Sequence, residues 1–203
     1  MEIYLVRHGE TGGNVAKRHQ SEATSLTPRG REQIKQTGAL LKELQPTHLI
    51  SSSVLRAVES SRYIGEVLDM IPETNASFAE LIRPTFLQGH FHKSIRSMLF
   101  YVRWYYGFTD RQKDGGETYV DLRTRIKTAQ AILVQYPADA KVVVVSHSVF
   151  INFFLAHMCQ EKKMSLWQAF VRFSKVLSIK NGSITKVMYD PAASKNTCAW
   201  RVE

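Results

Sequence analysis

Cysteine is scarce in this sequence, with two residues in 203, Cys159 and Cys198. They stand far apart, and neither belongs to a closely spaced group of Cys and His residues of the kind that binds zinc. This spacing excludes a cysteine-based metal site and a disulfide-rich secreted scaffold. We therefore expect two reduced thiols, the usual state of cysteine in a cytosolic protein.

Long hydrophobic runs are also missing. The first apolar run, residues 3–6, is too short for the core of a signal peptide and lies between Glu2 and Arg7. The most apolar stretch, residues 142–158, has polar side chains in its middle, which indicates a buried strand followed by a helix rather than a membrane span. We expect a cytoplasmic protein with no membrane partner.

Acidic residues are in the minority: 18 Asp and Glu against 27 Lys and Arg give a formal net charge of +9. This excess favours anionic partners such as phosphorylated metabolites or nucleic acid. The basic residues are scattered along the chain, a pattern that suits a phosphate pocket better than a polybasic arm. We expect a phosphorylated small-molecule substrate and no nucleic-acid partner; the oligomeric state stays open, with a dimer as one option.

Strand and helix patterns alternate along the chain. This predicts an α/β fold, a three-layer α/β/α sandwich with a wound, mostly parallel sheet, and the length suits a single domain over residues 1–203. The predicted strands are residues 2–7, 47–51, a short one near Phe78, and 141–146. The predicted helices are residues 29–44, 53–69, 118–136, 148–158 and 165–173, and a hairpin with an Asn181-Gly182 turn spans residues 176–190.

Residues 85–114 differ from their surroundings because they mix aromatic and basic side chains. Helical spacing places Leu99, Val102 and Tyr106 on a face expected to be buried, with Arg96 and Arg103 on another. One interpretation is a helix whose aromatic residues cap the core. The alternative is a lid that contacts the non-phosphate part of a substrate, and we expect this inserted segment to set substrate specificity.

Polar side chains follow the predicted strands at the points where the strands end. Because the carboxyl ends of parallel strands meet at one edge of a sheet, we expect these side chains to gather there. Guanidinium groups bind two phosphoryl oxygens at once, and imidazole can donate a hydrogen bond or attack phosphorus. The sequence therefore predicts a site for a dianionic phosphoryl group, comprising Arg7, His8, Asn14, Arg56, Glu80, His147 and Ser148.

Several segments, taken in chain order, resemble the motifs of the histidine phosphatase superfamily, the phosphoglycerate mutase-like group. They are RHGET (residues 7–11) followed by Asn14, LTPRGREQ (26–33), SSSVLRAVES (51–60), GGETYVDLRTR (115–125) and VVVVSHS (142–148). A single RHG would be a weak signal, but ordered motifs over nearly the whole chain are a specific one.

The resemblance implies a role for each position. His8 would be the nucleophile that takes the phosphoryl group as phosphohistidine, and Glu80 would be the acid that protonates the leaving group and later the base that activates water. His147 would act in catalysis and, with Arg7, Asn14 and Arg56, would hold the phosphoryl oxygens.

Ser148 departs from the family pattern, which usually has glycine after the second histidine. Its backbone N–H, at a helix start, could still face phosphate, and serine also suits a helix N-cap. Its side chain could equally narrow the pocket.

The resemblance thus implies a phosphomonoesterase that works through phosphohistidine, with no cofactor and no metal, because the arginine cations do the work of a metal. One alternative is a phosphoglycerate mutase-type phosphoryl transferase, although residues 85–114 are shorter than we would expect of a sugar-acid mutase. Another is a non-catalytic binder of phosphorylated ligands or nucleic acid, for which His8 as a nucleophile would be unnecessary. We favour the phosphomonoesterase.

Overall fold

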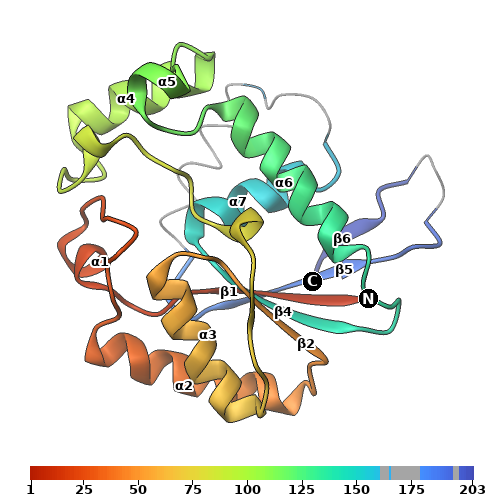
Figure 1. The fold of residues 1–203 in the computed structure, drawn as a ribbon. Coiled ribbons are helices and arrows are strands. Elements are labelled where there is room, and N and C mark those ends of the chain that lie inside the picture. The colour runs from red at the N-terminus through yellow and green to blue at the C-terminus, as the bar shows by residue number, and fades with distance from the viewer. Residues whose placement is uncertain (161–164, 166–178, 194–196) are drawn as a thin grey trace.

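The computed structural model describes residues 1–160, 165, 179–193 and 197–203. Its strands form one sheet in the order β3-β2-β4-β1-β5-β6 (Figure 1). Strands β1 to β4 run parallel, while β5 is antiparallel to β1 and β6 is antiparallel to β5. The strands are β1 (Glu2–Arg7), β2 (His48–Ser51), β3 (Glu73–Thr74), β4 (Lys141–Ser146), β5 (Ile184–Tyr189) and β6 (Trp200–Val202).

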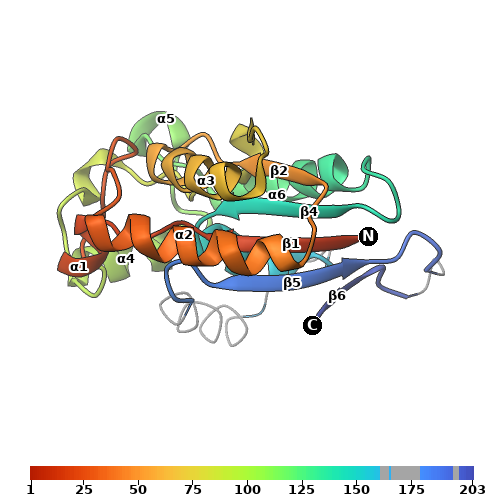
Figure 2. The same cartoon turned by 90° about the horizontal axis from the view of Figure 1, so that it is seen from below.

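Helices cover both faces of this sheet, as the two views in Figures 1 and 2 show. Helices α2 and α3 pack on one face, and α6 and α7 lie on the other. The α-helices are α1 (Gly12–Ala16), α2 (Pro28–Glu43), α3 (Leu55–Leu68), α4 (Ile95–Tyr106), α5 (Arg111–Asp114), α6 (Tyr119–Leu133) and α7 (Ser148–His157), with short 3₁₀ turns η1 (Ala76–Phe78) and η2 (Thr85–Leu87). The mixed α/β fold expected from the sequence is confirmed.

The two central strands are apolar on both faces because both faces are covered. Val142 and Val144 of β4 join the core against α6 and α7, whereas Val143 and Val145 join the core against α2 and α3. A parallel strand that is buried on both sides is expected to read as a continuous hydrophobic run, as this one does. The rigid centre of the sheet thus fixes where each strand ends.

The start of α2 follows from its sequence. The Oγ1 of Thr27 accepts a hydrogen bond from the N–H of Gly30 at 3.0 Å, and Pro28 occupies the first helical position. A Thr N-cap satisfies one of the free N–H groups of the first turn, and proline loses nothing there because that N–H has no intrahelical partner.

Three expectations about local structure need correction or fall outside the described chain. The strand expected near Phe78 is wrong: strand β3 lies earlier, and Phe78 ends the 3₁₀ turn η1 as a fully buried side chain. The helix expected over residues 165–173 and the first arm of the expected hairpin fall almost entirely outside the described residues. Asn181 and Gly182 do form a turn, and β5 follows it.

The buried face of α4 is not the one that the spacing indicated. Leu99, Val102 and Tyr106 are about half exposed, and the helix instead buries Phe100, Trp104 and Tyr105. The indole of Trp104 packs edge-on against Tyr119 and Phe153, and its Nε1 donates to the carbonyl of Glu117 at 2.8 Å. Because both faces of α4 carry large apolar side chains, partners from α6 and α7 decide which face is buried.

The two cysteines are not free thiols. Cys159 follows α7 and Cys198 precedes β6, and the two form a disulfide with a Cα–Cα distance of 5.4 Å, within the usual range for such a bond. The expectation of reduced thiols is therefore wrong. Residues far apart in the sequence meet here because β6 returns alongside β5 toward the end of α7.

None of the helices within the described ranges has both the length and the apolar character needed to cross a membrane.

The packing of α4 gives a test of the fold. We expect Trp104→Ala to lower the free energy of unfolding by about 3–5 kcal/mol, because it removes a fully buried indole and its hydrogen bond. Leu99→Ala, on the outward face, is the matched control and is expected to change it by less than about 1 kcal/mol. Urea denaturation followed by circular dichroism measures both. Equal losses would contradict the orientation of α4.

Candidate functional site

Three parallel strands bring their carboxyl ends to one edge of the sheet. Arg7, at the end of β1, is in register with Ser146, at the end of β4, and Ser51 of β2 is opposite Val145. The next residues continue this alignment, since the N–H of His8 donates to the carbonyl of Ser146 at 3.0 Å. The candidate site is therefore built where the rigid sheet ends and the loops begin.

His8 and His147 face each other at this edge, with ring centroids 5.1 Å apart. Both rings are almost completely buried. Nδ1 of His8 lies 2.7 Å from the carbonyl of Gly9, and Nε2 accepts a hydrogen bond from Nε of Arg56 at 3.2 Å. Since a guanidinium can only donate, the proton of the neutral ring must be on Nδ1, and the lone pair of Nε2 accepts the hydrogen bond from Arg56.

The charge state of His8 agrees with this tautomer. Burial lowers the pKa of His8 well below its usual value, and the cations of Arg56 and then Arg7 lower it further. The adjacent cation of Arg7 has the smallest of these three effects. The structure assigns larger effects to burial and to Arg56, a residue from another element of the fold.

His147 is held by a serine from the neighbouring strand end. Its Nε2 lies 2.8 Å from Oγ of Ser52, and that oxygen also accepts the N–H of Val54 at 3.2 Å. A hydroxyl oxygen has two lone pairs, so Ser52 can hold Nε2 of His147 in either tautomer of the ring, and Nδ1 is the nitrogen left outside this contact. This buried Nδ1 has no hydrogen-bond partner among the described residues. Burial, Arg56 and His8 lower the pKa of His147 well below its usual value.

The guanidinium groups of Arg7 and Arg56 lie at the same edge without a carboxylate ion pair in the described part of the chain. Nη1 of Arg7 donates to the carbonyl of Ile179, and Nη1 of Arg56 donates to the carbonyl of Ser21 at 3.3 Å. Burial lowers the pKa of Arg7, and it lowers the pKa of Arg56 to about 10, although Glu80 partly opposes both effects. Both groups remain cations at neutral pH.

Asn14 lies in α1, where the loop after β1 turns back. Thr11 caps this helix in a reciprocal capping box with Asn14. Oδ1 of Asn14 accepts from the N–H of Thr11 at 3.2 Å and from Nδ2 of Asn181 at 3.0 Å. With its oxygen occupied in this way, the NH₂ group of Asn14 is left as a donor.

Gly9 is required by a close approach between two motifs. A Cβ on Gly9 would lie 2.4 Å from the carbonyl oxygen of Gly30, and a Cβ on Gly30 would lie 2.1 Å from the carbonyl oxygen of Glu10. Glu10 itself accepts a hydrogen bond from Oγ1 of Thr27, which fixes the loop against the start of α2. The loop that carries His8 is thus pressed against the first turn of α2 with no space for a side chain.

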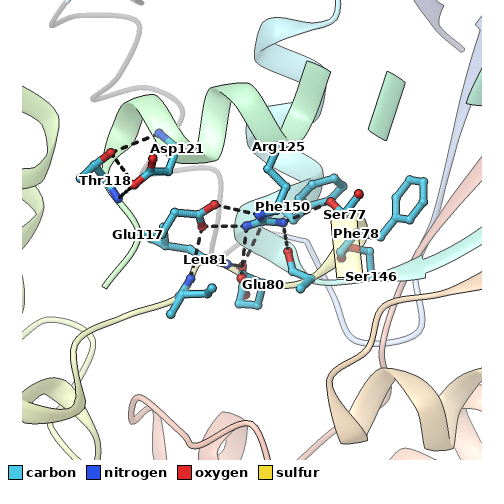
Figure 3. Close-up of polar contacts among 12 residues, drawn as sticks. Ser77, Phe78, Glu80, Leu81, Glu117, Thr118, Asp121, Arg125, Ser146 and Phe150 are labelled. Carbon is cyan, nitrogen blue, oxygen red and sulfur yellow. Dashed lines mark hydrogen bonds and ion pairs between the residues drawn. The ribbon is translucent and has the colours of Figure 1, made fainter. Parts of the chain in front are cut away.

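Glu80 reaches the site from the segment after η1. Its Oε1 accepts the N–H of Leu81 at 3.0 Å and the N–H of Phe150, in the first turn of α7, at 3.2 Å (Figure 3). The carboxyl group is half-buried, and the Glu80 charge acts on both Arg7 and Arg56. Its second oxygen is left for a ligand or a proton.

An ion pair behind Glu80 holds this segment in place. Arg125 of α6 binds Glu117 at 2.7 Å, and its guanidinium also donates to the backbone carbonyls of Ala79 and Glu80 (Figure 3). Bidentate pairing with a carboxylate leaves Arg125 little freedom, so the carbonyls that it holds are fixed as well. Arg125 and Glu117 therefore position Glu80 without contacting the ligand site themselves.

Ser148 is the first residue of α7 and is half-buried beside His147. Neither its hydroxyl group nor its N–H has a hydrogen-bond partner among the described residues. The nearby N–H of Phe150, in contrast, is taken by Glu80. The helix start thus offers the N–H of Ser148, as the sequence analysis expected, but part of the first turn serves Glu80 instead.

Sequence reasoning did not assign roles to Ser52, Glu117, Arg125 and Asn181. The first three lie inside motifs that were noticed, so the motifs themselves were the available signal. Asn181 was noted only as a turn residue, yet its Nδ2 lies within hydrogen-bond distance of the carbonyls of His8 and Gly9. A short turn motif carries no information about this distant contact.

No group of three or more His, Cys, Asp and Glu side chains that could hold a metal ion occurs in the part of the chain that the structure describes. The residues that gather at the sheet edge are cations, neutral imidazoles and an amide, with Glu80 at the border. Such a set binds and polarises an oxyanion, and the unprotonated Nε2 of His8 can form a bond to an electrophilic atom when an oxyanion takes over the hydrogen bond from Arg56.

Comparison with known proteins agrees with these features. The sequence model of the histidine phosphatase superfamily (branch 1) matches residues 3–197. A probable phosphoglycerate mutase, GpmB, of Citrobacter koseri is 26% identical over 191 residues, which cover 93% of this chain and 85% of the relative.

Two solved structures illustrate the shared fold. A mycobacterial glucosyl-3-phosphoglycerate phosphatase is 23% identical, with a TM-score of 0.72 over 100% of this chain and 96% of that one. A phosphoserine phosphatase mutant from Entamoeba histolytica is 18% identical, with a TM-score of 0.72 over 99% and 94% of the two chains. At these identities the likeness is one of fold.

The buried imidazoles give a pH-dependent prediction. In the folded protein His8 and His147 have pKa values below their usual 6.5, so the unfolded chain binds more protons as the pH falls below 6.5. The free energy of unfolding is expected to decrease there by up to about 1.4 kcal/mol per pH unit for each ring. Long-range ¹H–¹⁵N NMR spectra should show uncharged rings at pH 6, with His8 protonated on Nδ1.

Spectra of His8→Asn and His147→Asn assign the two signals. A ring that titrates near pH 6.5 in the folded protein would contradict the burial and the Arg56 contact.

Proposed function

Because the chain belongs to the histidine phosphatase superfamily, we propose that it is a phosphomonoesterase that hydrolyses a phosphorylated small molecule through a phosphohistidine intermediate. The observation that carries this proposal is the hydrogen bond from Arg56 to Nε2 of His8. It supports a neutral ring whose Nε2 lone pair becomes available for attack when a phosphoryl oxygen replaces Nε2 as the acceptor from Arg56. No metal takes part in the proposed reaction.

In the first step Nε2 of His8 attacks phosphorus and the bond from phosphorus to the ester oxygen breaks. Nδ1 keeps its proton and its hydrogen bond to Gly9, so the carbonyl stabilises the positive charge that the ring gains. Glu80 gives a proton to the departing alkoxide. Arg7, Arg56, Asn14 and His147, together with the N–H of Ser148, hold the phosphoryl oxygens as charge redistributes.

In the second step a water molecule attacks the phosphohistidine. Glu80, now ionised, takes a proton from this water, the phosphorus–nitrogen bond breaks, and neutral His8 is restored. The position of Glu80, held by Leu81 and Phe150 and backed by Arg125, keeps one carboxyl oxygen available for both proton transfers.

Phosphate release is preferred over transfer to a second substrate. Two structural neighbours bear the names of phosphatases, and a relative bears the name of a probable mutase, so the transferase stays the alternative. In this proposal the chain is one domain and residues 85–114 choose the substrate, since α4 and the loop before it pack beside α1 (Figure 1).

Removal of the nucleophile tests the proposal directly. We expect His8→Asn to lower phosphate release from a panel of phosphomonoesters by at least roughly 10³-fold, and to abolish an acid-labile phosphoryl adduct that wild type forms in a rapid quench. The control is His48→Asn, at the end of β2 far from the site, which should leave phosphate release and adduct formation unchanged. Equal release by wild type and His8→Asn would refute the mechanism.

The acid–base role of Glu80 has its own signature. With p-nitrophenyl phosphate, whose leaving group needs no proton, Glu80→Gln should still form the phosphoenzyme but hydrolyse it slowly, so that the adduct accumulates. With an alkyl phosphate, adduct formation itself should fall by roughly 10²–10⁴-fold. Quench-flow with ³²P-labelled substrates separates the two steps. Equal effects on both substrates would remove Glu80 from this role.

A further inference from the structure

Arg83 is a charged residue near the site that the proposed reaction does not use. It lies three positions after Glu80 and is half-buried. Its Nε donates to the hydroxyl group of Tyr101, on α4, at 2.8 Å. Its two terminal NH₂ groups have no acceptor in the described ranges, and no carboxylate there forms an ion pair with it. A guanidinium held in this way offers its two terminal NH₂ groups as a fork for an anion.

The backbone around Arg83 is held on both sides. The carbonyl of the preceding residue, Ile82, accepts a hydrogen bond from the N–H of Glu117 at 2.8 Å. The following residue, Pro84, packs closely against Gly116: a Cβ added to Gly116 would lie 2.6 Å from the ring of Pro84. Since Tyr101 also fixes the side chain, the guanidinium is preorganised rather than free to swing into solvent.

Arg83 shares the electrostatic environment of the candidate active site. Its charge acts on Arg56, which binds His8, and on His19 and His92. The backbone also places Arg83 beside Glu80, because the N–H of Ile82 donates to Glu117, and Glu117 binds the same Arg125 that holds the carbonyl of Glu80. Burial would lower the pKa of Arg83, but Tyr101 and Glu80 outweigh it, and Arg83 stays fully charged.

Tyr101 also lies beside the loop after α1. His19 stacks edge-on against His92 with centroids 4.7 Å apart, and the ring of Tyr101 lies 6.2 Å from His19. Backbone hydrogen bonds join the loop to residues 89–92, among them His19 N–H to the carbonyl of His90 at 2.9 Å. These contacts hold Tyr101, the partner of Arg83, against the loop after α1.

The charges at the site leave Arg83 without an anionic partner during the proposed reaction. A phosphoryl dianion matches the cations of Arg7 and Arg56, and Glu80 must carry a proton when the leaving group departs. The carboxylates that act on Arg56 are Glu80 and Glu22, and neither pairs with Arg83. One fixed cation therefore remains unmatched during the reaction.

We propose that Arg83, oriented by Tyr101, binds a second anionic group of the substrate, a carboxylate or a second phosphate, on the leaving-group side of the phosphoryl site. This inference rests on the proposed phosphomonoesterase function and narrows its substrates to phosphomonoesters with two anionic groups. Tyr101 is a positioning residue in this assignment.

Matched substrates of three kinds test the assignment. Alkyl phosphates of two to four carbons are compared with the same chains ending in a carboxylate and with the same chains ending in a second phosphate. Wild type is expected to show a kcat/KM at least roughly 10-fold higher for one doubly anionic series than for the alkyl phosphates, mainly through KM. The series with the larger gain identifies the second group.

Arg83→Gln is expected to reduce that preference to about one while leaving kcat/KM for alkyl phosphates within about twofold. Tyr101→Phe should lose part of the preference, and Arg83→Lys should restore part of it to the glutamine variant. Arg103→Gln, an exposed arginine on α4, is the charge control and should keep the full preference. Thermal melting checks that each variant is folded.

The outcomes separate the two proposals. No preference in wild type for either series at any length, or a parallel loss of activity on all substrates in Arg83→Gln, overturns the role of Arg83. Failure to release phosphate from any substrate overturns the phosphomonoesterase instead. In that case, calorimetric binding of the same compounds to wild type and Arg83→Gln still tests the second anion site: a preference for doubly anionic ligands that depends on Arg83 supports it, and its absence refutes it.

Discussion

The hydrogen bond from Arg56 to His8 is the interaction on which the rest of the site depends. An imidazole can accept from a guanidinium only when that nitrogen is unprotonated, so a single contact sets the charge, the tautomer and the direction of His8. Burying a cation beside a neutral ring costs free energy, and the backbone carbonyl of Ser21 offsets only part of that cost. Burial of the central strands on both faces of the sheet stabilises the fold and offsets the rest of this cost.

Residues within the strands fill the core, and residues that follow the strands form the candidate site. The valines of β4 fill both cores, while the residue after that strand, His147, faces His8 in the candidate site. The loops then hold the functional groups through backbone contacts: the carbonyl of Gly9 orients His8, and the N–H of Phe150 orients Glu80. Side chains such as Ser52 and Arg125 supply the remaining restraint. The functional groups are therefore rigid before any ligand arrives, as electrostatic catalysis requires.

The sequence was a good guide wherever a pattern is local. The four valines of β4 and the Thr27-Pro28 start of α2 predicted their elements closely, and ordered motifs predicted that His8, Arg56 and His147 would meet at one sheet edge. It was a poor guide where distant partners decide. Both faces of α4 are apolar, so spacing could not show that Trp104 packs against Phe153; nor could it show that Cys159 meets Cys198. Within the site, the contact of Asn181 with the distant carbonyls of His8 and Gly9 was likewise not predictable from the sequence.

The contact between Gly9 and Gly30 has a consequence for how such sequences vary. Neither position can gain a methyl group without pushing the backbone of the other segment, and the displaced segment would carry His8 with it. The glycine of RHG and the glycine of TPRG are thus halves of one steric requirement, although neither touches a ligand. Divergent chains that keep both glycines can be expected to keep this geometry, whereas a histidine motif found without its distant glycine is a poor guide to the same architecture.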